Sequence, residues 1–559
     1  METKTIQNKL WLLCSILMMF LLAGCPIPID GSSNGSPISV REQSLTKPDP
    51  AVPCAERFIS RDLNHFTATT GISEVRRFEA NGGGVALGDL DNDGDLDIVL
   101  ANHGGANSIQ WNEGELNFRV ILLDHGESRA VSVVDVDGDG WLDIVFTRHT
   151  TGPTYWHNER GQQFNREVLP GVTKPLYSMD WADLDQDGDL DIVGASYDSA
   201  LLDDLGQSFI DDEKGGIYHY ENREGRFYPT KLADEAQALS LILIDLNNDN
   251  LLDILVGNDF DIHDQVWYRK EGGWAKAEPF PNMSRNTMSI EATDIDNDGV
   301  LEIFSTDMVP YSTEGYLGDA WKPVIDGLIY NPIPEGDPQV MSNMLQFDLG
   351  EWGYQNESEA RGINASGWSW SAKFGDLDQD GYVDLYIVNG MIEFTTFRHL
   401  SYHELMEENQ AYQNDGFGYF EPNRNWNLNS TRSGRGTVMG DLDGDGDLDI
   451  VINNLRARAQ LYENQLCTGS NMLVDLNWSN TLNRRAIGTR LVLETEDGEL
   501  YHRRVTANSG YLSGNPSRVH FGFPEEKELK RLEIYWPDGE VTYLEEILPR
   551  TVLSVRRKQ

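Results

Sequence analysis

The chain has 559 residues, with 44 Lys and Arg against 91 Asp and Glu, which gives a formal net charge of −47. Such an acidic chain is unsuited to binding nucleic acid, because phosphate contacts need basic surface. Disorder is also excluded, since 39% hydrophobic residues with 14 Trp, 21 Tyr and 20 Phe supply a core. The first 54 and the last 90 residues are electrically balanced, so the whole net charge lies in residues 55–469.

The amino terminus predicts an export signal. Lys4 and Lys9 precede an apolar stretch over 10–23, and residues 22–25 read Leu-Ala-Gly-Cys. This ending resembles the lipobox of bacterial lipoproteins, which implies a signal peptide over 1–24 and lipidation of Cys25; an ordinary signal peptide is the alternative. Residues 25–54 are rich in Pro, Ser and Gly and predict a tether. We therefore expect an exported protein held by its lipid at the cell envelope, on the periplasmic side of the outer membrane or at the cell surface.

One acidic nine-residue motif occurs seven times between residues 89 and 449. The copies are DLDNDGDLD from Asp89, DVDGDGWLD from Asp135, DLDQDGDLD from Asp183, DLNNDNLLD from Asp245, DIDNDGVLE from Asp294, DLDQDGYVD from Asp376 and DLDGDGDLD from Asp441. We call them loops 1 to 7. Thirty of the 74 acidic residues in 55–469 lie inside these loops, and repetition in register excludes an accidental acidic turn.

The spacing within each loop indicates a calcium cage. Side chains at positions 1, 3 and 5, the carbonyl of position 7 and the carboxylate at position 9 converge, and Gly at position 6 permits the turn. Ca²⁺ is the expected ion, with up to seven sites and five complete loops. Loop 4 departs through Asn247 and Asn250, and loop 5 through Glu302. The predicted ligands are Asp89, Asp91, Asp93, Asp95, Asp97, Asp135, Asp137, Asp139, Trp141, Asp143, Asp183, Asp185, Asp187, Asp189, Asp191, Asp245, Asn247, Asp249, Leu251, Asp253, Asp294, Asp296, Asp298, Val300, Glu302, Asp376, Asp378, Asp380, Tyr382, Asp384, Asp441, Asp443, Asp445, Asp447 and Asp449.

The loops lie between short apolar strands. Position 12, where an EF-hand needs an acidic residue, is never acidic, and an apolar strand follows loops such as loop 1 (IVLAN) and loop 7 (IVINN). An aromatic residue, often followed by Asn, comes later in most units, so each unit supplies about four strands. We therefore predict an all-β fold, a seven-bladed β-propeller over 55–469. The loops resemble FG-GAP/VCBS repeats, the repeat of integrin α-subunit propellers. The 82 residues from Asp294 to Asp376 indicate an insertion at about 307–368.

The last 90 residues lack the loops. Alternating strands with turns at Asp497-Gly498 and Asp538-Gly539 predict a small β-sandwich over 470–559. Its motifs resemble those of the ASPIC/UnbV domain: Asn483, Ala486-Ile487-Gly488, Ser509-Gly510-Tyr511, Ser513, His520-Phe521-Gly522 and Trp536-Pro537-Asp538-Gly539. Repeats followed by this domain are the layout of the cartilage acidic protein/UnbV family, a resemblance that implies calcium and extracellular binding. Cys54 and Cys467 are either a disulfide closing the acidic segment or two separate thiols.

A ligand face is predicted at the propeller end opposite the loops, where the strand after each loop ends. The residues expected there are His103, Arg148, His149, Tyr197, Asp259, Asp307 and Arg456. Between loops 6 and 7, residues 397–412 predict a short helix with His399 and His403 on one face, and a solvated helix is favoured over a metal site.

The predicted function is a lipid-anchored binding or adhesion module for an extracellular protein or glycan. A polysaccharide lyase or hydrolase acting at the face opposite the loops is one alternative, and a scaffold subunit of a surface complex is another. The sequence contains no nucleophile-elbow, phosphate-loop or dinucleotide-binding motif in the required context. The paired aspartates are assigned to metal, which makes them poor acids for glycoside hydrolysis.

Overall fold

The computed structural model describes residues 32–33, 37–45, 54–71, 74–207, 215–330 and 332–558. The predicted signal peptide and Cys25 lie outside these residues. Within them, no helix is both long and apolar enough to cross a membrane.

In this part of the chain, seven antiparallel sheets repeat one pattern, with consecutive strands paired side by side. The first strands are β4 (Val85–Gly88), β8 (Ser128–Val134), β12 (Ser178–Ala182), β16 (Ala238–Ile244), β21 (Ser289–Thr293), β27 (Gly367–Gly375) and β33 (Gly434–Gly440). The second strands are β5 (Asp97–Leu100), β9 (Asp143–Arg148), β13 (Asp191–Ala195), β17 (Asp253–Asn258), β22 (Glu302–Thr306), β28 (Asp384–Asn389) and β34 (Asp449–Asn454). Each acidic loop joins a first strand to a second strand, and its position 9 is the first residue of the second strand.

The outer half of each sheet completes the pattern. The third strands are β6 (Ala106–Asn112), β10 (Thr154–Asn158), β14 (Ile217–Arg223), β18 (Gln265–Lys270), β25 (Met344–Asp348), β31 (Gln410–Asn414) and β35 (Arg458–Glu463). The fourth strands are β7 (Phe118–His125), β11 (Phe164–Glu167), β15 (Arg226–Ala233), β19 (Gly273–Ala277), β26 (Tyr354–Asn356), β32 (Phe420–Pro422) and β3 (Ile59–Phe66). Neighbouring sheets cover the second strands on both faces, which explains why apolar residues directly follow position 9 in each of them.

The sheets form a closed ring. The first strand of each sheet contacts the first strand of the next, from β4 through β8, β12, β16, β21 and β27 to β33, and β33 contacts β4. This is the arrangement of a β-propeller, and the predicted all-β class is confirmed.

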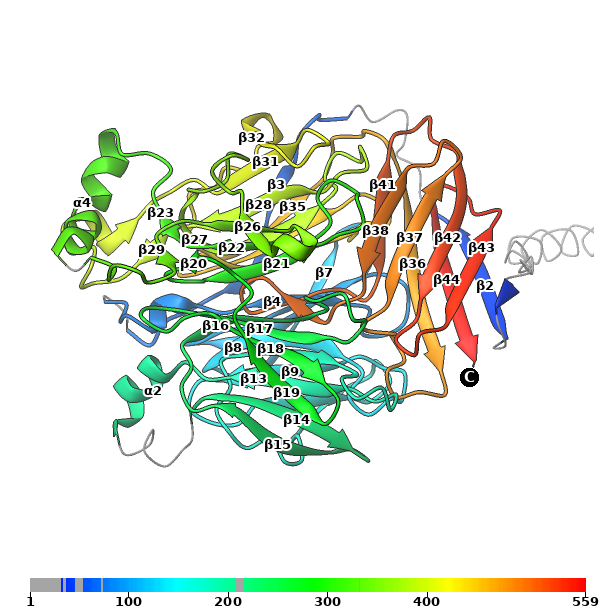
Figure 1. The fold of residues 1–559 in the computed structure, drawn as a ribbon, viewed down its shortest axis with the longest axis horizontal. Helices are drawn as coiled ribbons and strands as arrows, with labels where there is room; N and C mark the ends of the chain where they lie inside the picture. Colours follow the sequence, from blue (N-terminus) through cyan, green and yellow to red (C-terminus); the bar gives the residue numbers. More distant parts are fainter. Residues whose placement is uncertain are drawn as a thin grey trace, which may run out of the picture.

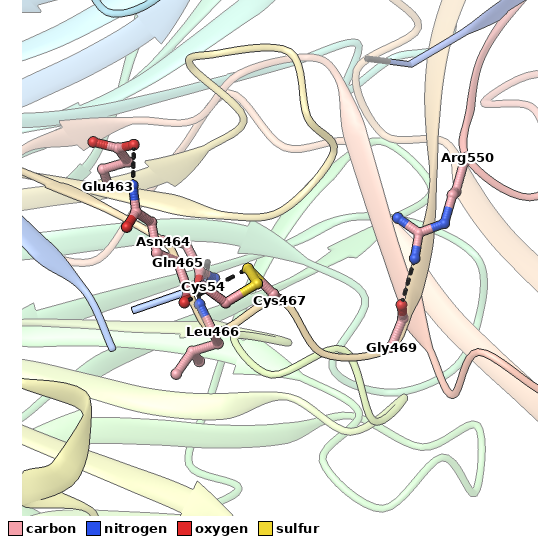
Figure 2. Close-up of a disulfide and its surroundings, with 8 residues drawn as sticks. All are labelled: Cys54, Glu463, Asn464, Gln465, Leu466, Cys467, Gly469 and Arg550. Atoms are coloured by element: carbon pink, nitrogen blue, oxygen red, sulfur yellow. Dashed lines mark hydrogen bonds between the residues drawn. A yellow bond between two sulfur atoms is a disulfide. The ribbon is translucent and has the colours of Figure 1, made fainter. Parts of the chain in front are cut away.

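The last sheet of the ring combines strands from both ends of the chain segment that forms the propeller. The last sheet takes its outer strand, β3, from the start of the propeller, and β3 pairs with β35. Next to this pair the structure joins Cys54 and Cys467 in a disulfide, with their Cα atoms 6.0 Å apart (Figure 2). The sequence left open whether these two cysteines form a disulfide or remain separate thiols, and the structure shows the disulfide. Because 413 residues separate the two cysteines, the disulfide fixes the ends of the whole ring together.

Two predictions about local structure need correction. The insertion ends earlier than predicted, because β25 and β26 at 344–356 are the outer strands of the fifth sheet. The inserted part, 307–343, carries β23 (Met308–Val309), α4 (Gly315–Tyr330) and β24 (Gln339–Val340), which pairs with β20 (Met283–Ser284). The helix predicted over 397–412 is wrong. That stretch forms the 3-10 turn η3 (Ser401–His403) and strand β30 (Glu404–Leu405), which pairs with β29 (Met391–Ile392), before β31.

The carboxy-terminal domain is a sandwich of two sheets, as predicted. One contains β38 (Leu500–Arg504), β37 (Arg490–Thr495), β42 (Leu529–Tyr535) and β43 (Val541–Glu545); the other contains β41 (Val519–Phe523), β36 (Ser470–Ser479) and β44 (Thr551–Lys558). Both sheets gain an edge strand from the amino terminus. β1 (Ser32–Ser33) pairs with β43, and β2 (Ile38–Ser44) pairs with β44. The prediction of a tether over 25–54 is therefore wrong for 38–44, where pairing with an open sheet edge orders the chain.

The sandwich lies at one end of the propeller, and the helices α2 (Asp198–Leu205) and α4 lie at the opposite end (Figure 1). From the sandwich, residues 505–516 enter the middle of the ring and form the hairpin β39 (Asn508–Ser509) and β40 (Ser513–Gly514). We call this segment the plug. β40 pairs with β4, and further hydrogen bonds to the ring include Asn508 Nδ2 to Val131 O, Asn508 N to Asp180 Oδ1, Ser240 Oγ to Gly510 O, Gly510 N to Ile290 O and Tyr511 N to Ser371 Oγ.

Tyr511, at the tip of the plug, is fully buried. Its hydroxyl donates to Asn81 O at 2.8 Å, and its ring centroid lies 5.2 Å from that of Trp370.

We expect Tyr511→Ala to destabilise the protein by about 3–5 kcal/mol, because removal of this large aromatic side chain leaves a cavity between ring and plug. Tyr511→Phe loses the hydroxyl's hydrogen bonds to Asn81 O and to the Tyr177 hydroxyl and should cost about 1–2 kcal/mol. Denaturant unfolding measures both, and equal stability of the two variants would contradict a packing role for the plug.

Candidate functional site: the acidic loops

The seven loops share one backbone conformation. Position 4 has a φ between +56° and +78°, and position 6 has a φ between +65° and +106°, so both lie in the left-handed region. Position 4 is Asn92, Gly138, Gln186, Asn248, Asn297, Gln379 or Gly444. Gly and Asn adopt this region most readily. Loop 4 keeps the same turn although Asn250, with a φ of +65°, replaces Gly.

Hydrogen bonds within each loop repeat as well. The N–H of position 6 donates to the carboxylate of position 1, as from Gly94 to Asp89 at 3.1 Å. The carboxylate of position 9 accepts from the N–H of position 2, as Asp97 does from Leu90 at 3.0 Å. In the six loops that end in Asp, its other oxygen accepts from a backbone N–H at the end of the third strand, as Asp97 does from Asn112 at 2.8 Å. The carboxylate of position 9, a predicted metal ligand, therefore also connects the loop to the second and third strands of its sheet.

The asparagines at the ends of the third strands connect neighbouring blades, a role that the sequence reasoning missed. Asn158 Nδ2 donates to Leu142 O in its own loop and to Leu90 O in the preceding loop, both at 2.8 Å. Asn112, Asn414 and Asn464 make the same pair of bonds. The recurrence of an aromatic residue followed by Asn was the available signal, but it was used only to count strands.

The carboxylates converge as a divalent cation requires. In four loops, oxygens from three residues lie within 4.8 Å of one another: Asp89, Asp91 and Asp93; Asp135, Asp137 and Asp143; Asp183, Asp185 and Asp187; Asp294, Asp296 and Glu302. One carboxylate oxygen of each of Asp135, Asp183, Asp189, Asp296, Asp378 and Asp447 is buried without a hydrogen-bond donor. Buried anionic oxygens without donors are costly. The carboxylate oxygens suit a hard cation, and in loop 2 a ring nitrogen of His157 also lies within 4.8 Å of oxygens from Asp137 and Asp139.

The clustering of these carboxylates also affects their pKa values. Burial and the neighbouring carboxylates raise the pKa of Asp183 to about 7 and those of Asp189 and Asp443 to about 8. Without a cation, the loops therefore favour protonated carboxyls near neutral pH.

The sandwich covers the loops. Leu482 N and Asn483 N donate to Gly188 O in loop 3 at 2.8 and 2.9 Å, and Arg518 donates to Gly94 O in loop 1 at 2.8 Å. The glycine at position 6 leaves room for this contact, because a Cβ at Gly381 would meet the Tyr501 ring and one at Gly446 would meet the Asn471 amide. Basic side chains of the sandwich, Arg485 among them, face the acidic loops.

The predicted ligand face is not an exposed surface. His103, His149, Tyr197, Asp259 and Asp307 are all buried. Tyr197 donates to Asp259 at 2.6 Å, and His149 lies 2.9 Å from Asp204 of α2. The ends of the second strands converge near the axis, where residues 78–82, held by Arg129 and Arg435, cover them. Arg148 and Arg456 remain partly exposed.

His399 and His403 do not form a site together. His399 Nε2 lies 3.1 Å from Ala320 O of α4, whereas the His403 ring packs against Phe394 with the ring centroids 4.8 Å apart. The helical spacing that would have brought them together is absent, since Tyr402 and His403 have a φ of +58°.

Comparison with known proteins identifies both parts of the chain. Residues 479–559 match the ASPIC and UnbV family model, and 89–146, 135–194, 245–305 and 401–452 match the FG-GAP-like repeat. Cartilage acidic protein 1 of Xenopus tropicalis is 33% identical over 119 residues, and that of Homo sapiens is 32% identical over 115 residues. The matched residues are 20% and 19% of this chain, and only 18% and 17% of those proteins.

Two solved structures show a weaker likeness. An Agrocybe aegerita lectin, described as recognising non-reducing terminal N-acetylglucosamine, aligns with a TM-score of 0.39 and 15% identity over 66% of this chain and 88% of its own. A Bacillus licheniformis rhamnogalacturonan lyase aligns with a TM-score of 0.37 and 12% identity over 73% of this chain and 76% of its own. Likenesses of this size have no bearing on function.

The raised pKa values predict a pH dependence for the metal-free protein. Asp183, Asp189 and Asp443 have folded pKa values of about 7 to 8, above the ordinary 3.8. Their contribution to stability is therefore fully present below about pH 4 and is lost as the pH rises through about 7 to 8. We expect the melting temperature in a chelator to fall between pH 5 and pH 8. A rise over this interval, measured by scanning calorimetry, would contradict the buried-carboxylate geometry.

Proposed function

We propose that this chain, which carries FG-GAP-like repeats and an ASPIC and UnbV domain, is a calcium-stabilised binding module of the cell envelope. The observation that carries the proposal is the arrangement of its two ends. The loops lie beneath the sandwich. At the opposite end, where α4 lies (Figure 1), several large apolar side chains are exposed.

Calcium acts structurally in this proposal. The oxygens without donors at positions 1 and 3 of loops 2, 3, 5 and 6 are coordination sites, and the bound ion neutralises carboxylates that burial otherwise penalises. Position 9 ties each loop to its own sheet, and in four blades the third-strand asparagine also ties its loop to the preceding loop. Ordering these loops therefore stabilises neighbouring blades and the surface on which the sandwich lies.

Loop 1 offers a matched pair of variants. Asp89→Asn removes a ligand carboxylate at position 1, whereas Asp95→Asn changes position 7, which contributes its backbone carbonyl. We expect Asp89→Asn to reduce the number of bound Ca²⁺ ions by one and to lower the melting temperature in calcium by several degrees, while Asp95→Asn retains the full number. Elemental analysis of the dialysed protein counts the ions. An unchanged melting temperature of the wild-type protein on chelation would refute the structural role.

The proposed ligand surface is the insertion patch, which consists of Tyr316, Phe394, Tyr402 and Met406. These side chains are 48%, 40%, 88% and 51% exposed. The Tyr316 hydroxyl accepts from Met406 N at 3.3 Å and donates to Glu404 O at 3.4 Å, which joins α4 to the segment after η3. Apolar clusters on soluble proteins indicate interaction sites, and tyrosine rings suit both protein and sugar ligands.

The position of the amino terminus supports a ligand surface at the end of the propeller that carries α4. β2 lies in the sandwich, so the predicted lipid at Cys25 joins the protein at the end away from α4 (Figure 1). A lipid anchor there would direct the insertion patch away from the membrane.

Binding is tested on a glycan array and by capture of envelope and extracellular proteins with the immobilised chain. We expect Tyr316→Ala with Tyr402→Ala to abolish saturable binding at unchanged melting temperature. Trp352→Ala is the matched control, because Trp352 is equally exposed, at 88%, in the turn η2 (Gly350–Trp352) outside the patch. Undiminished binding by the patch variant would exclude this surface, and release of a cleaved polymer would favour an enzyme.

A further inference from the structure

A cavity of about 220 Å³ lies between the propeller and the sandwich. Its propeller side is formed by the loop-side ends of β12, β16, β21 and β27, and its other side by the sandwich and the plug. The volume exceeds the space of a single water many times over, so the cavity is large enough for a small organic molecule.

Three arginines of the sandwich line this cavity without an acidic partner. Arg490, Arg503 and Arg504 form no ion pair with a carboxylate of the described residues. Arg503 donates through Nη1 to the carbonyl of His502 at 2.9 Å, and its Nη2 is buried without an acceptor. Arg490 stacks over the Tyr535 ring at 3.7 Å. Burial lowers the pKa of Arg504 to about 10, so this side chain is still charged at neutral pH.

The carboxylates that also line the cavity are already engaged. Glu291 pairs with Lys373 at 2.8 Å, and Asp180 accepts from the backbone N–H groups of Trp181, Leu243 and Asn508. Asp294 and Asp376 are position 1 of loops 5 and 6 and accept from the N–H of position 6 in their own loops. The aspartates of loops 5 and 6 attract Arg503 and Arg504 across the cavity, but no carboxylate of the described residues forms a direct ion pair with them. The buried Nη2 of Arg503 therefore lacks an acceptor that a ligand would supply.

The rest of the wall is apolar. Ile242, Leu252, Leu301, Phe374 and Met439 contribute to it. A site with convergent guanidinium groups on one side and aliphatic and aromatic surface on the other matches a ligand with one oxyanion group on a small apolar body.

We propose that the cavity between propeller and sandwich is a binding site for a small organic anion, held through its carboxylate, sulfate or phosphate oxygens by Arg503 and Arg504. The guanidinium fork supplies paired N–H donors to planar or tetrahedral oxyanions. The site is separate from the insertion patch, so this inference stands whether or not the patch binds a ligand.

Isothermal titration of the calcium-loaded full chain tests the site with two probes, sodium benzoate and sodium sulfate, each against sodium chloride at equal ionic strength. We expect saturable binding at one site in the wild-type protein. Arg504→Gln should weaken it by about tenfold or more, since hydrogen bonds between charged groups are lost. Binding of benzoate alone identifies an organic carboxylate site, and binding of sulfate identifies a tetrahedral oxyanion site.

Two further variants separate loss of binding from loss of folding. Ala292→Phe fills the cavity without changing its charge and should abolish binding, while Arg531→Gln on β42, outside the cavity, should leave binding unchanged. Calcium content and melting temperature verify that each variant is folded. The proposal is overturned if the wild-type protein gives no saturable binding with either probe, or if Arg504→Gln and Ala292→Phe both bind as the wild type does.

Discussion

The structure depends on the burial of clustered carboxylates. Each acidic loop brings several aspartates to one point between a first and a second strand. Neighbouring blades and the sandwich bury the carboxylate of position 9 in every loop, while position 5 stays exposed in loops 1 to 5. Negative charges in such a place are costly unless protons or cations accompany them. Thirty of the 74 acidic residues in 55–469 lie in these loops, so part of the net charge of −47 is concentrated there, and the raised pKa values of Asp183 and Asp443 follow from the same clustering.

The loops are also the place where the two domains meet. Carbonyls at position 6 accept hydrogen bonds from the sandwich, and the glycines there allow the two backbones to approach. The plug extends this contact into the ring, where its backbone and side chains bond to first strands of several blades. A propeller has an open centre by geometry, and in this chain the second domain occupies it. Propeller and sandwich are therefore coupled through the same residues that order the loops.

Sequence reasoning was accurate where the pattern is local. The nine-residue spacing placed every loop between two strands, and the turns at Asp497-Gly498 and Asp538-Gly539 placed two hairpins of the sandwich. It failed where burial depends on distant segments. His103 and Tyr197 were expected at a surface because they follow the strand ends, yet residues 78–82 and the helix α2 cover that region. Residues 38–44 lacked any periodic signal and were ordered only by pairing with β44.

The sequence by itself determined the repeat, the position of each acidic loop between two strands and the all-β class, because these follow from residue types a few positions apart. The tertiary structure alone decided which end of the propeller is free, how the plug fills the ring and which arginines face the cavity. These features arise from contacts between residues hundreds of positions apart, such as Tyr511 with Asn81 and Arg518 with Gly94. The acidic excess that is obvious in the composition therefore indicated cations, and only the fold showed that the loops carrying it are covered by a second domain.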